Sequence, residues 1–174
     1  LSMQAWFHYF ASLAMHNEGR QVPMDSPSIT SFTIREPFGV VGVIPAFNSP
    51  VLLGAMSIGP ALAAGNTVIL KPASDTVLAA WELCQAFWAG GVSRRTLQFL
   101  PCSGSGPGSE LVSHDDATAV ILTGGTDTAA LLRMWTVPCR QPRLRHNAVL
   151  AGNFSGFHRQ TTTRRTRQHG AYRY

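Results

Sequence analysis

Short apolar runs alternate with segments of helical length along most of the chain, and this alternation restricts the fold more than any other feature. Strand-like runs rich in apolar, mostly branched residues occur at 40–45, 67–71, 97–101 and 118–123. Strands and helices that alternate through short connections predict an α/β fold, with a parallel sheet, right-handed crossovers and helices on both faces. The predicted helices cover residues 2–16, 51–64, 76–89, about 107–112 and 126 to about 134, and 17–27 is predicted to be a loop.

Charge is distributed very unevenly between the two ends of the chain. Residues 1–138 contain six basic and nine acidic residues, whereas 139–174 contain eight arginines and no acid. The formal net charge of +5 therefore describes neither part, and it does not make nucleic acid the default partner of the whole chain. The tail at 139–174 shows neither a strand period nor a helix period. Two explanations remain open, an arm that binds RNA or DNA through its arginines or translation in a wrong frame or past a truncation, and we favour the second.

Several functional classes are excluded by patterns that the chain lacks. Its three cysteines, Cys84, Cys102 and Cys139, have spacings that fit no metal-ligand or redox pattern, and their odd number argues against a secreted disulfide framework. Its histidines form no metal-binding motif, and no serine lies in a nucleophile-elbow pattern. The uncharged stretch 37–70 is divided by prolines and asparagines into pieces too short to span a bilayer. We therefore expect a cytoplasmic protein with no metal and no membrane span, and the first residue, Leu1, indicates that its beginning is missing.

The carboxyl ends of the four predicted strands carry polar or glycine-rich residues, and open α/β sheets bind their ligands at this edge. Asn48 follows the first strand, Lys71, the only lysine, ends the second, a loop at 104–108 follows the third, and Gly124 and Gly125 follow the fourth. Glycine-rich turns before helices suit phosphate, lysine suits ribose hydroxyls or phosphate, and an asparagine amide can donate to an oxyanion. The alternatives are ordinary turns, a solvated lysine and an asparagine bonded to its own turn. Four such ends on one edge favour a binding site.

Several stretches resemble a known family. The segments at 35–50, 61–74 and 122–129 read REPFGVVGVIPAFNSP, ALAAGNTVILKPAS and LTGGTDTA, and in this order they resemble the aldehyde dehydrogenase superfamily. LQFLPC at 97–102 and SHDDATAVILTGG at 113–125 are most similar to the branch that oxidises glutamate γ-semialdehyde, which forms from pyrroline-5-carboxylate.

The resemblance implies a fold, a cofactor and a role for the strand ends. Residues 1–138 would form a partial NAD(P)-binding domain, an incomplete Rossmann-like parallel sheet from the amino-terminal part of an enzyme that oxidises an aldehyde. Asn48 would be catalytic, stabilising the oxyanion of the thiohemiacetal. The segment after the first strand would line the nicotinamide, and Lys71 would bind the adenosine ribose of NAD or NADP. The cofactor-binding residues implied by the resemblance are Ile44, Pro45, Ala46, Phe47, Lys71, Ala73, Ser74, Asp75, Gly104, Gly108, Thr123, Gly124 and Gly125.

Departures from the family pattern change what we expect of this chain. Ser74 stands where many members have a glutamate, so NADP would be tolerated as well as NAD, although Asp75 could still bond a ribose hydroxyl. Gly125 replaces a serine but keeps the backbone donor. No cysteine lies in the family's G-Q-x-C setting, and residues 128–174 contain no acid that could act as general base. We expect no turnover by this chain alone and a homo-oligomeric parent enzyme. The alternative is a catalytically inactive nucleotide-binding protein or an Arg-rich nucleic-acid-binding protein.

Overall fold

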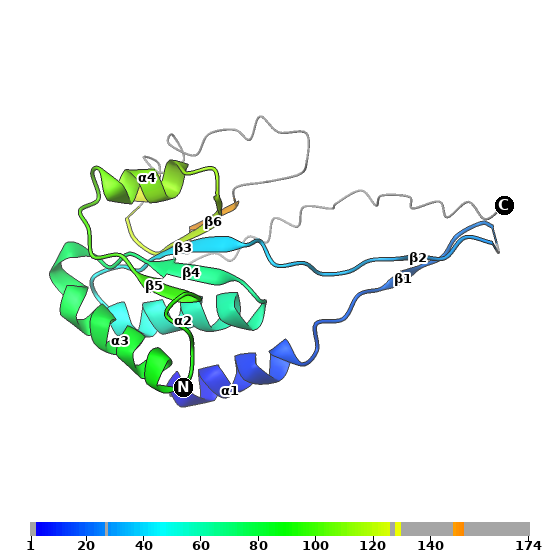
Figure 1. Cartoon of the computed structure of the whole chain (residues 1–174), viewed down its shortest axis with the longest axis horizontal. Helices are drawn as coiled ribbons and strands as arrows, with labels where there is room; N and C mark the ends of the chain where they lie inside the picture. Colours follow the sequence, from blue (N-terminus) through cyan, green and yellow to red (C-terminus); the bar gives the residue numbers. More distant parts are fainter. Residues whose placement is uncertain (1–2, 27, 126–127, 130–147, 152–174) are drawn as a thin grey trace.

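The predicted alternation of strands and helices is present along the chain (Figure 1). The computed structural model describes residues 3–26, 28–125, 128–129 and 148–151. Its helices are α1 (Met3–Ala14), α2 (Pro50–Ala63), the 3-10 helix η1 (Ser74–Thr76), α3 (Val77–Ala89) and α4 (Pro107–Ser113). Its strands are β1 (Gln21–Val22), β2 (Ser31–Phe32), β3 (Val40–Ile44), β4 (Thr67–Leu70), β5 (Leu97–Phe99), β6 (Ala117–Leu122) and β7 (Ala148–Ala151).

Five of these strands form one sheet in the order β5-β4-β3-β6-β7, and every neighbouring pair is parallel. The central strand is β3, whose Val41 lies opposite Val68 of β4 on one side and Ala119 of β6 on the other. The chain builds outward from β3 to β5 and then crosses back to place β6 on the other side of β3. This is the strand order of the doubly wound dinucleotide-binding fold. The predicted α/β fold with a parallel, Rossmann-like sheet is confirmed.

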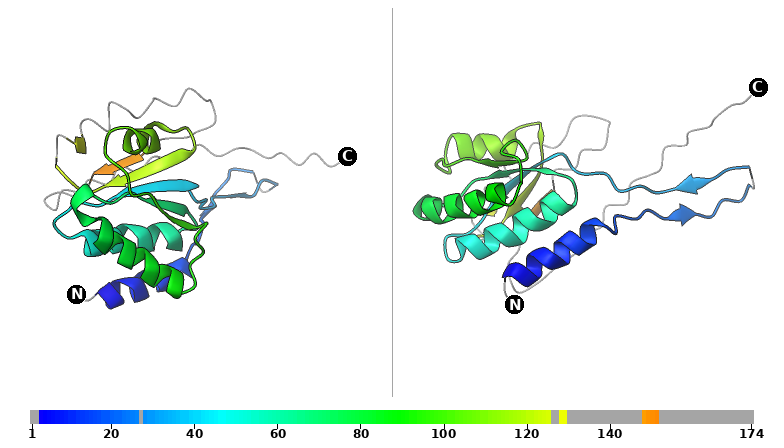
Figure 2. Two further views of the ribbon diagram at one scale, coloured as in Figure 1. Left: turned by 60° about the vertical axis from the view of Figure 1, so that its left-hand side comes forward. Right: turned by 60° about the horizontal axis from the view of Figure 1, so that its bottom comes forward.

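Helices cover both faces of the sheet, as the sequence predicts. The views in Figures 1 and 2 place α2 and α3 on one face and α4 on the other, with α1 packed against α2. Val43 and Leu70 of the sheet are fully buried together with Ile58 of α2 in the larger core. A smaller cluster around Val112 and Leu122 fills the space beneath α4. Because the sheet is buried on both faces, its strands are continuously apolar rather than alternating.

The connection from α2 into β4 is held by the buried side chain of Asn66. Its Nδ2 donates to Ala61 O at 2.9 Å, and its Oδ1 accepts a hydrogen bond from Gly39 N at 3.1 Å. Gly65 precedes it with a φ of 80°, a conformation that favours glycine. The asparagine therefore links the end of α2 to the beginning of β3, two segments far apart in sequence, and sets the orientation of the helix on the sheet.

Three short strands, β1, β2 and β7, are not predicted from the sequence. Within 17–27, predicted to be a loop, Gln21 pairs with Phe32 across the short antiparallel strands β1 and β2, which lie on an arm that extends from the body (Figure 1). Within the tail, β7 pairs with β6 so that Ala151 lies opposite Leu122. The prediction of a loop is therefore wrong at Gln21 and Val22, and β7 lies in a tail that shows no strand period. These strands span two and four residues, too few for a periodic signal, and β7 is recognisable only through its pairing.

Two further predictions extend beyond the described residues. The helix predicted from residue 126 to about 134 is confirmed at Thr128 and Ala129, where Ala129 N donates to Gly125 O at 3.1 Å. The remaining residues of that segment lie outside the described part of the chain. The same is true of the tail at 139–174, apart from β7, so the two explanations for its arginines remain hypotheses.

Candidate active site at the carboxyl edge of the sheet

The carboxyl ends of β3, β4, β5 and β6 lie at one edge of the sheet because all four strands are parallel. Backbone hydrogen bonds extend the ladder just past these ends. They run from Lys71 N to Val43 O at 2.9 Å, from Leu100 N to Leu70 O at 2.9 Å, and from Thr123 N to Ile44 O at 3.0 Å. The four loops that hold the predicted site residues therefore begin side by side.

Asn48 lies at the middle of this edge, in the turn between β3 and α2. The strand order reverses between β3 and β6, and open sheets bind ligands at such a switch point. The side chain of Asn48 is exposed and has no hydrogen-bond partner among the described residues. The alternative in which Asn48 bonds its own turn is therefore not supported, and its amide donors are available to a ligand. Pro45 anchors the turn because it is buried, whereas Ala46 is half-buried and Phe47 is exposed.

Lys71 directly follows β4, and its side chain is buried, with only 6% exposed. The alternative of a solvated lysine is therefore wrong. Its Nζ donates to Pro72 O at 2.9 Å, the one partner of this ammonium group within the described residues, and no acid there forms an ion pair with it. An ammonium group has three N–H donors, so two remain for a ligand. A buried cation with unused donors suits hydroxyl groups or a phosphate.

The glycine-rich loop after β5 runs beside Lys71. Gly104 is exposed, Gly106 has a φ of 80°, and Gly108 is buried at the start of α4. A Cβ on Gly108 would lie 3.0 Å from Lys71 Cε, so this glycine and the lysine are in direct contact. The glycine-rich loop and the lysine, which the sequence places 33 positions or more apart, therefore form one structural unit.

The remaining predicted residues follow β4 and β6, and they differ in how far they are exposed to solvent. Thr123 and Gly124 directly follow β6 and are half-buried. Gly125 is exposed, and a Cβ added to it would meet nothing within 4 Å. After Lys71, Ala73 is half-buried, whereas Ser74 and Asp75 are exposed in η1. The hydroxyl of Ser74 and the carboxylate of Asp75 follow Lys71 by three and four residues, in the segment that leads from β4 to α3. Sequence reasoning missed one participant, the carbonyl oxygen of Pro72, because backbone acceptors leave no residue-type signal.

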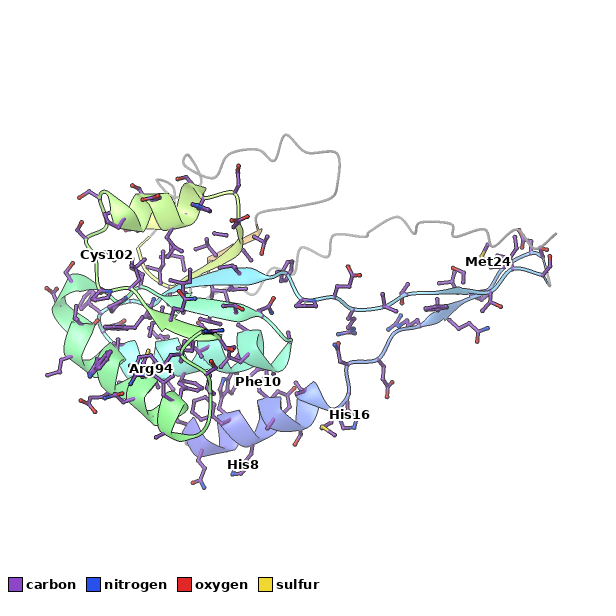
Figure 3. The ribbon with its side chains drawn as sticks, viewed as in Figure 1. His8, Phe10, His16, Met24, Arg94 and Cys102 are labelled. Atoms are coloured by element: carbon purple, nitrogen blue, oxygen red, sulfur yellow. The ribbon has the colours of Figure 1, made fainter. Side chains whose placement is uncertain are left out.

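The cysteines within the described residues differ in environment. Cys102 is half-buried in the segment between β5 and α4 (Figure 3). Cys84 lies on α3 with its side chain fully buried in the core. Burial raises the pKa of the Cys84 thiol from 9.0 to about 11 because it disfavours the thiolate. Cys84 is therefore neither placed nor ionised for nucleophilic attack, and Cys139 lies outside the described residues.

We expect a maleimide to modify Cys102 in the folded protein and to leave Cys84 unmodified. The reagent needs an accessible thiolate, and the core withholds both access and ionisation from Cys84. Peptide mapping by mass spectrometry after short labelling would measure both sites. Cys102→Ser should remove the labelled peptide, and urea should release Cys84. Equal labelling of both cysteines in the folded chain would contradict the core position of Cys84. The raised pKa of Cys84 also makes stability depend on pH. The contribution of this thiol to the free energy of unfolding is highest below pH 9.0, where the thiol is neutral in both states, and it falls as the pH rises towards 11, because only the unfolded chain ionises easily.

The described residues also bear on two other kinds of site, a metal centre and a membrane span. No group of three or more histidine, cysteine, aspartate or glutamate side chains there is arranged to hold a metal ion. Among the same residues, no helix has the length and apolar character needed to cross a membrane.

The chain is similar to characterised proteins over most of its length. A family model described as "Aldehyde dehydrogenase family" matches residues 2–134. The 2-aminomuconic semialdehyde dehydrogenase of Danio rerio is 36% identical over 132 residues, which cover 76% of this chain and 27% of that protein. Retinaldehyde dehydrogenase 3 of Mus musculus is 37% identical over 127 residues, which cover 73% of this chain and 25% of that protein. The chain thus spans about a quarter of the length of these curated relatives.

Solved structures share the fold. Betaine aldehyde dehydrogenase from Staphylococcus aureus, solved in complex with NAD+, superposes with a TM-score of 0.73 at 30% identity, covering 76% of this chain and 26% of that one. A 3,6-anhydro-L-galactose dehydrogenase, solved in complex with NADP, gives a TM-score of 0.72 at 32% identity, covering 76% of this chain and 28% of that one. The parallel sheet of this chain and the helices that flank it match the cofactor-binding part of these aldehyde dehydrogenases.

Proposed function

The chain belongs to the aldehyde dehydrogenase family, and from this premise we propose that residues 1–138 are the NAD(P)-binding part of an enzyme that oxidises an aldehyde to a carboxylic acid. One observation carries the proposal. The structure gathers a buried ammonium group with two unused donors, an unbonded asparagine amide and two glycine-rich turns at the switch-point edge of a Rossmann-like sheet. Relatives of known structure, solved with NAD+ or NADP, support the same cofactor.

The residues of this edge would divide the cofactor between them. Lys71 would donate from its buried ammonium group to ribose hydroxyls. The backbone around Gly124 and Gly125 would face the pyrophosphate with N–H donors, at the beginning of a helix. Residues 44–47, held by buried Pro45, would line the nicotinamide. When bound, the nicotinamide supplies a hydride acceptor.

Asn48 would act on the substrate rather than on the cofactor. Its free side-chain amide would donate to the oxygen of the aldehyde as negative charge develops there, which lowers the barrier to attack.

The family's reaction also needs a cysteine thiolate that attacks the aldehyde and a glutamate that activates water. This sequence has neither the family's cysteine motif nor an acidic residue in 128–174. We therefore propose that this chain binds the nucleotide without turning over an aldehyde. Calorimetric titration with NAD and NADP, followed by assay of aldehyde oxidation, tests both parts, since absence of nucleotide binding would refute the first and measurable turnover the second.

We propose an amino-acid-derived semialdehyde as the substrate class of the whole enzyme. The similarity of 97–102 and 113–125 to the glutamate γ-semialdehyde branch supports that substrate, and the name of the Danio rerio relative supports 2-aminomuconic semialdehyde. The name of the structural relative adds betaine aldehyde as a cationic alternative. Assay of the whole enzyme with these three aldehydes and retinaldehyde would rank them, and a preference for betaine aldehyde or retinaldehyde would refute the semialdehyde proposal.

We also propose that the whole enzyme is a cytoplasmic homo-oligomer. Light scattering would test its oligomeric state, and cell fractionation would test its location.

Ser74→Glu is expected to select against NADP. Ser74 is exposed three residues after Lys71, so a carboxylate there would oppose the 2′-phosphate of NADP and accept hydrogen bonds from the ribose hydroxyls of NAD. We expect the dissociation constant for NADP to rise about tenfold, with that for NAD unchanged or lower. Ser74→Gln, of similar size and without charge, is the matched control. Equal effects of the two variants on NADP would show that Ser74 is not near the 2′-position.

A further inference from the structure

Gly108 is the point at which the glycine-rich loop, α4 and Lys71 meet. A Cβ on Gly108 would lie 2.5 Å from the carbonyl oxygen of Ser103 and 3.0 Å from Lys71 Cε. A carbon atom does not approach a carbonyl oxygen that closely without displacing it, so the loop and the lysine stem can close on this position only when it is glycine. Gly108 is itself buried, which leaves it little surface for direct contact with a ligand.

At the exposed glycines of this edge, an added side chain would not clash with neighbouring atoms. Gly106 has a φ of 80°, so its backbone conformation favours glycine while a Cβ would meet nothing within 4 Å. At Gly104 and Gly125 a Cβ would also meet nothing within 4 Å. Among these four glycines, Gly108 alone is restricted by contact with Lys71.

The stem of Lys71 packs against Gly108, whereas its hydrogen bond stays within its own segment. The hydrogen bond from Lys71 Nζ goes to Pro72 O, the carbonyl of the next residue, and so does not tie the side chain to α4 or its loop. The contact between Gly108 and Cε provides that tie. A displaced stem would carry the ammonium group away from its present place at the carboxyl edge.

We propose that Gly108 is a positioning residue, whose missing side chain fixes the direction in which Lys71 presents its ammonium group to the nucleotide. The part that concerns the nucleotide rests on the proposed function, whereas the effect on the lysine does not. This assigns to Gly108 an action through Lys71 in place of direct cofactor contact.

The first test measures the lysine without any nucleotide. Lys71 is the only lysine, so mass spectrometry of its peptide after brief treatment with an acetylating reagent reports on it alone. Overpacking by one methyl group shifts the equilibrium between the buried and the displaced lysine about tenfold towards the displaced one. Because the reagent reaches a displaced lysine more easily, we expect Gly108→Ala to accelerate acetylation of Lys71 about tenfold. Gly104→Ala, in the same loop but with open space at its Cβ, is the steric control for this rate only. Equal acetylation rates in all three proteins would overturn the proposal.

The second test is a double-mutant cycle on nucleotide binding. Gly108→Ala is expected to weaken binding of NAD or NADP about tenfold in the unmodified chain and to have no further effect in Lys71→Met, because both changes act through one ammonium group. The same factor in both backgrounds would show that Gly108 acts independently of Lys71 and would overturn the proposal. If the unmutated chain binds neither nucleotide, the proposed function fails, and the acetylation experiment still decides the effect on the lysine.

A third measurement covers the case in which Gly108→Ala does not fold. Lys71→Met keeps a carbon at the Cε position, and Lys71→Ala removes the whole stem. Amide hydrogen exchange across 103–110 should therefore become faster in Lys71→Ala than in Lys71→Met, relative to exchange in the distant segment 77–89. Identical exchange at 103–110 in the two variants would show that the contact has no mechanical role and would overturn the proposal.

Discussion

Lys71→Met is expected to weaken binding of NAD and NADP by about 10- to 100-fold while the chain stays folded, because hydrogen bonds from a charged group contribute about 1.5–3 kcal/mol. Methionine reproduces the buried stem and its contact with Gly108 but lacks the ammonium donors. Losing the hydrogen bond to the Pro72 carbonyl destabilises the folded state. Removing the buried positive charge stabilises it, because a buried cation carries a desolvation cost. The two effects oppose each other, so we expect the free energy of unfolding to change by less than about 1 kcal/mol.

The control for this experiment removes a cation elsewhere. Arg95 is exposed in the turn before β5, at the opposite edge of the parallel sheet from Lys71. Arg95→Met changes the net charge by the same amount and should leave the nucleotide dissociation constant within about twofold of the unmutated value. Titration by calorimetry and unfolding in urea would be run on the same preparations. Equal weakening by the two variants would mean that overall charge, rather than a bond from Lys71, attracts the nucleotide.

Ile58→Ala is expected to lower the free energy of unfolding by about 2–5 kcal/mol, the range for removing a large aliphatic side chain from a packed core. Ile58 lies on α2 with an exposure of 0% and belongs to the cluster that joins this helix to the sheet and to α3. The substitution would leave a cavity beneath β3, the strand that leads to Asn48. We therefore expect nucleotide binding to follow the fraction of folded protein rather than to fail separately.

The matched control lies on the same helix. Leu52 is 41% exposed, so Leu52→Ala removes a side chain of equal size that contributes less than about 1 kcal/mol. The midpoint and slope of urea unfolding would be compared for the three proteins, with equal slopes showing that the folded and unfolded states keep their surface areas. A larger loss from Leu52→Ala than from Ile58→Ala would mean that the outward and inward faces of α2 are reversed.

Sequence reasoning located the principal elements because their signals are local. The apolar run at 67–71 and the helical segment at 76–89 correspond to β4 and to η1 with α3, with small differences at the ends. It also placed Asn48 in the turn after one strand and Lys71 at the end of the next, and in a parallel sheet this alone puts them at one edge. β7 was missed because four apolar residues within arginine-rich sequence carry no period, and pairing with β6 is what makes them a strand.

The environment of the site residues depended on segments far apart in sequence. Taken alone, Lys71 favoured a solvated charge over a ligand-binding lysine, because its burial comes from packing that no local pattern encodes. Gly108 was one glycine of several, and its contact with Ser103 O and Lys71 Cε follows only from the path of the loop across β4.

The sequence by itself determined the α/β class, the succession of strands and helices and the positions of the polar residues after the strands, since each follows from local periodicity and chain order. Only the tertiary structure decided the strand order β5-β4-β3-β6-β7, the burial of Lys71, the free amide of Asn48 and the steric role of Gly108. Strand order and burial are properties of contacts between segments distant in the chain. The packing energy that selects among such contacts is shared by many residues, so no single stretch of sequence reveals it.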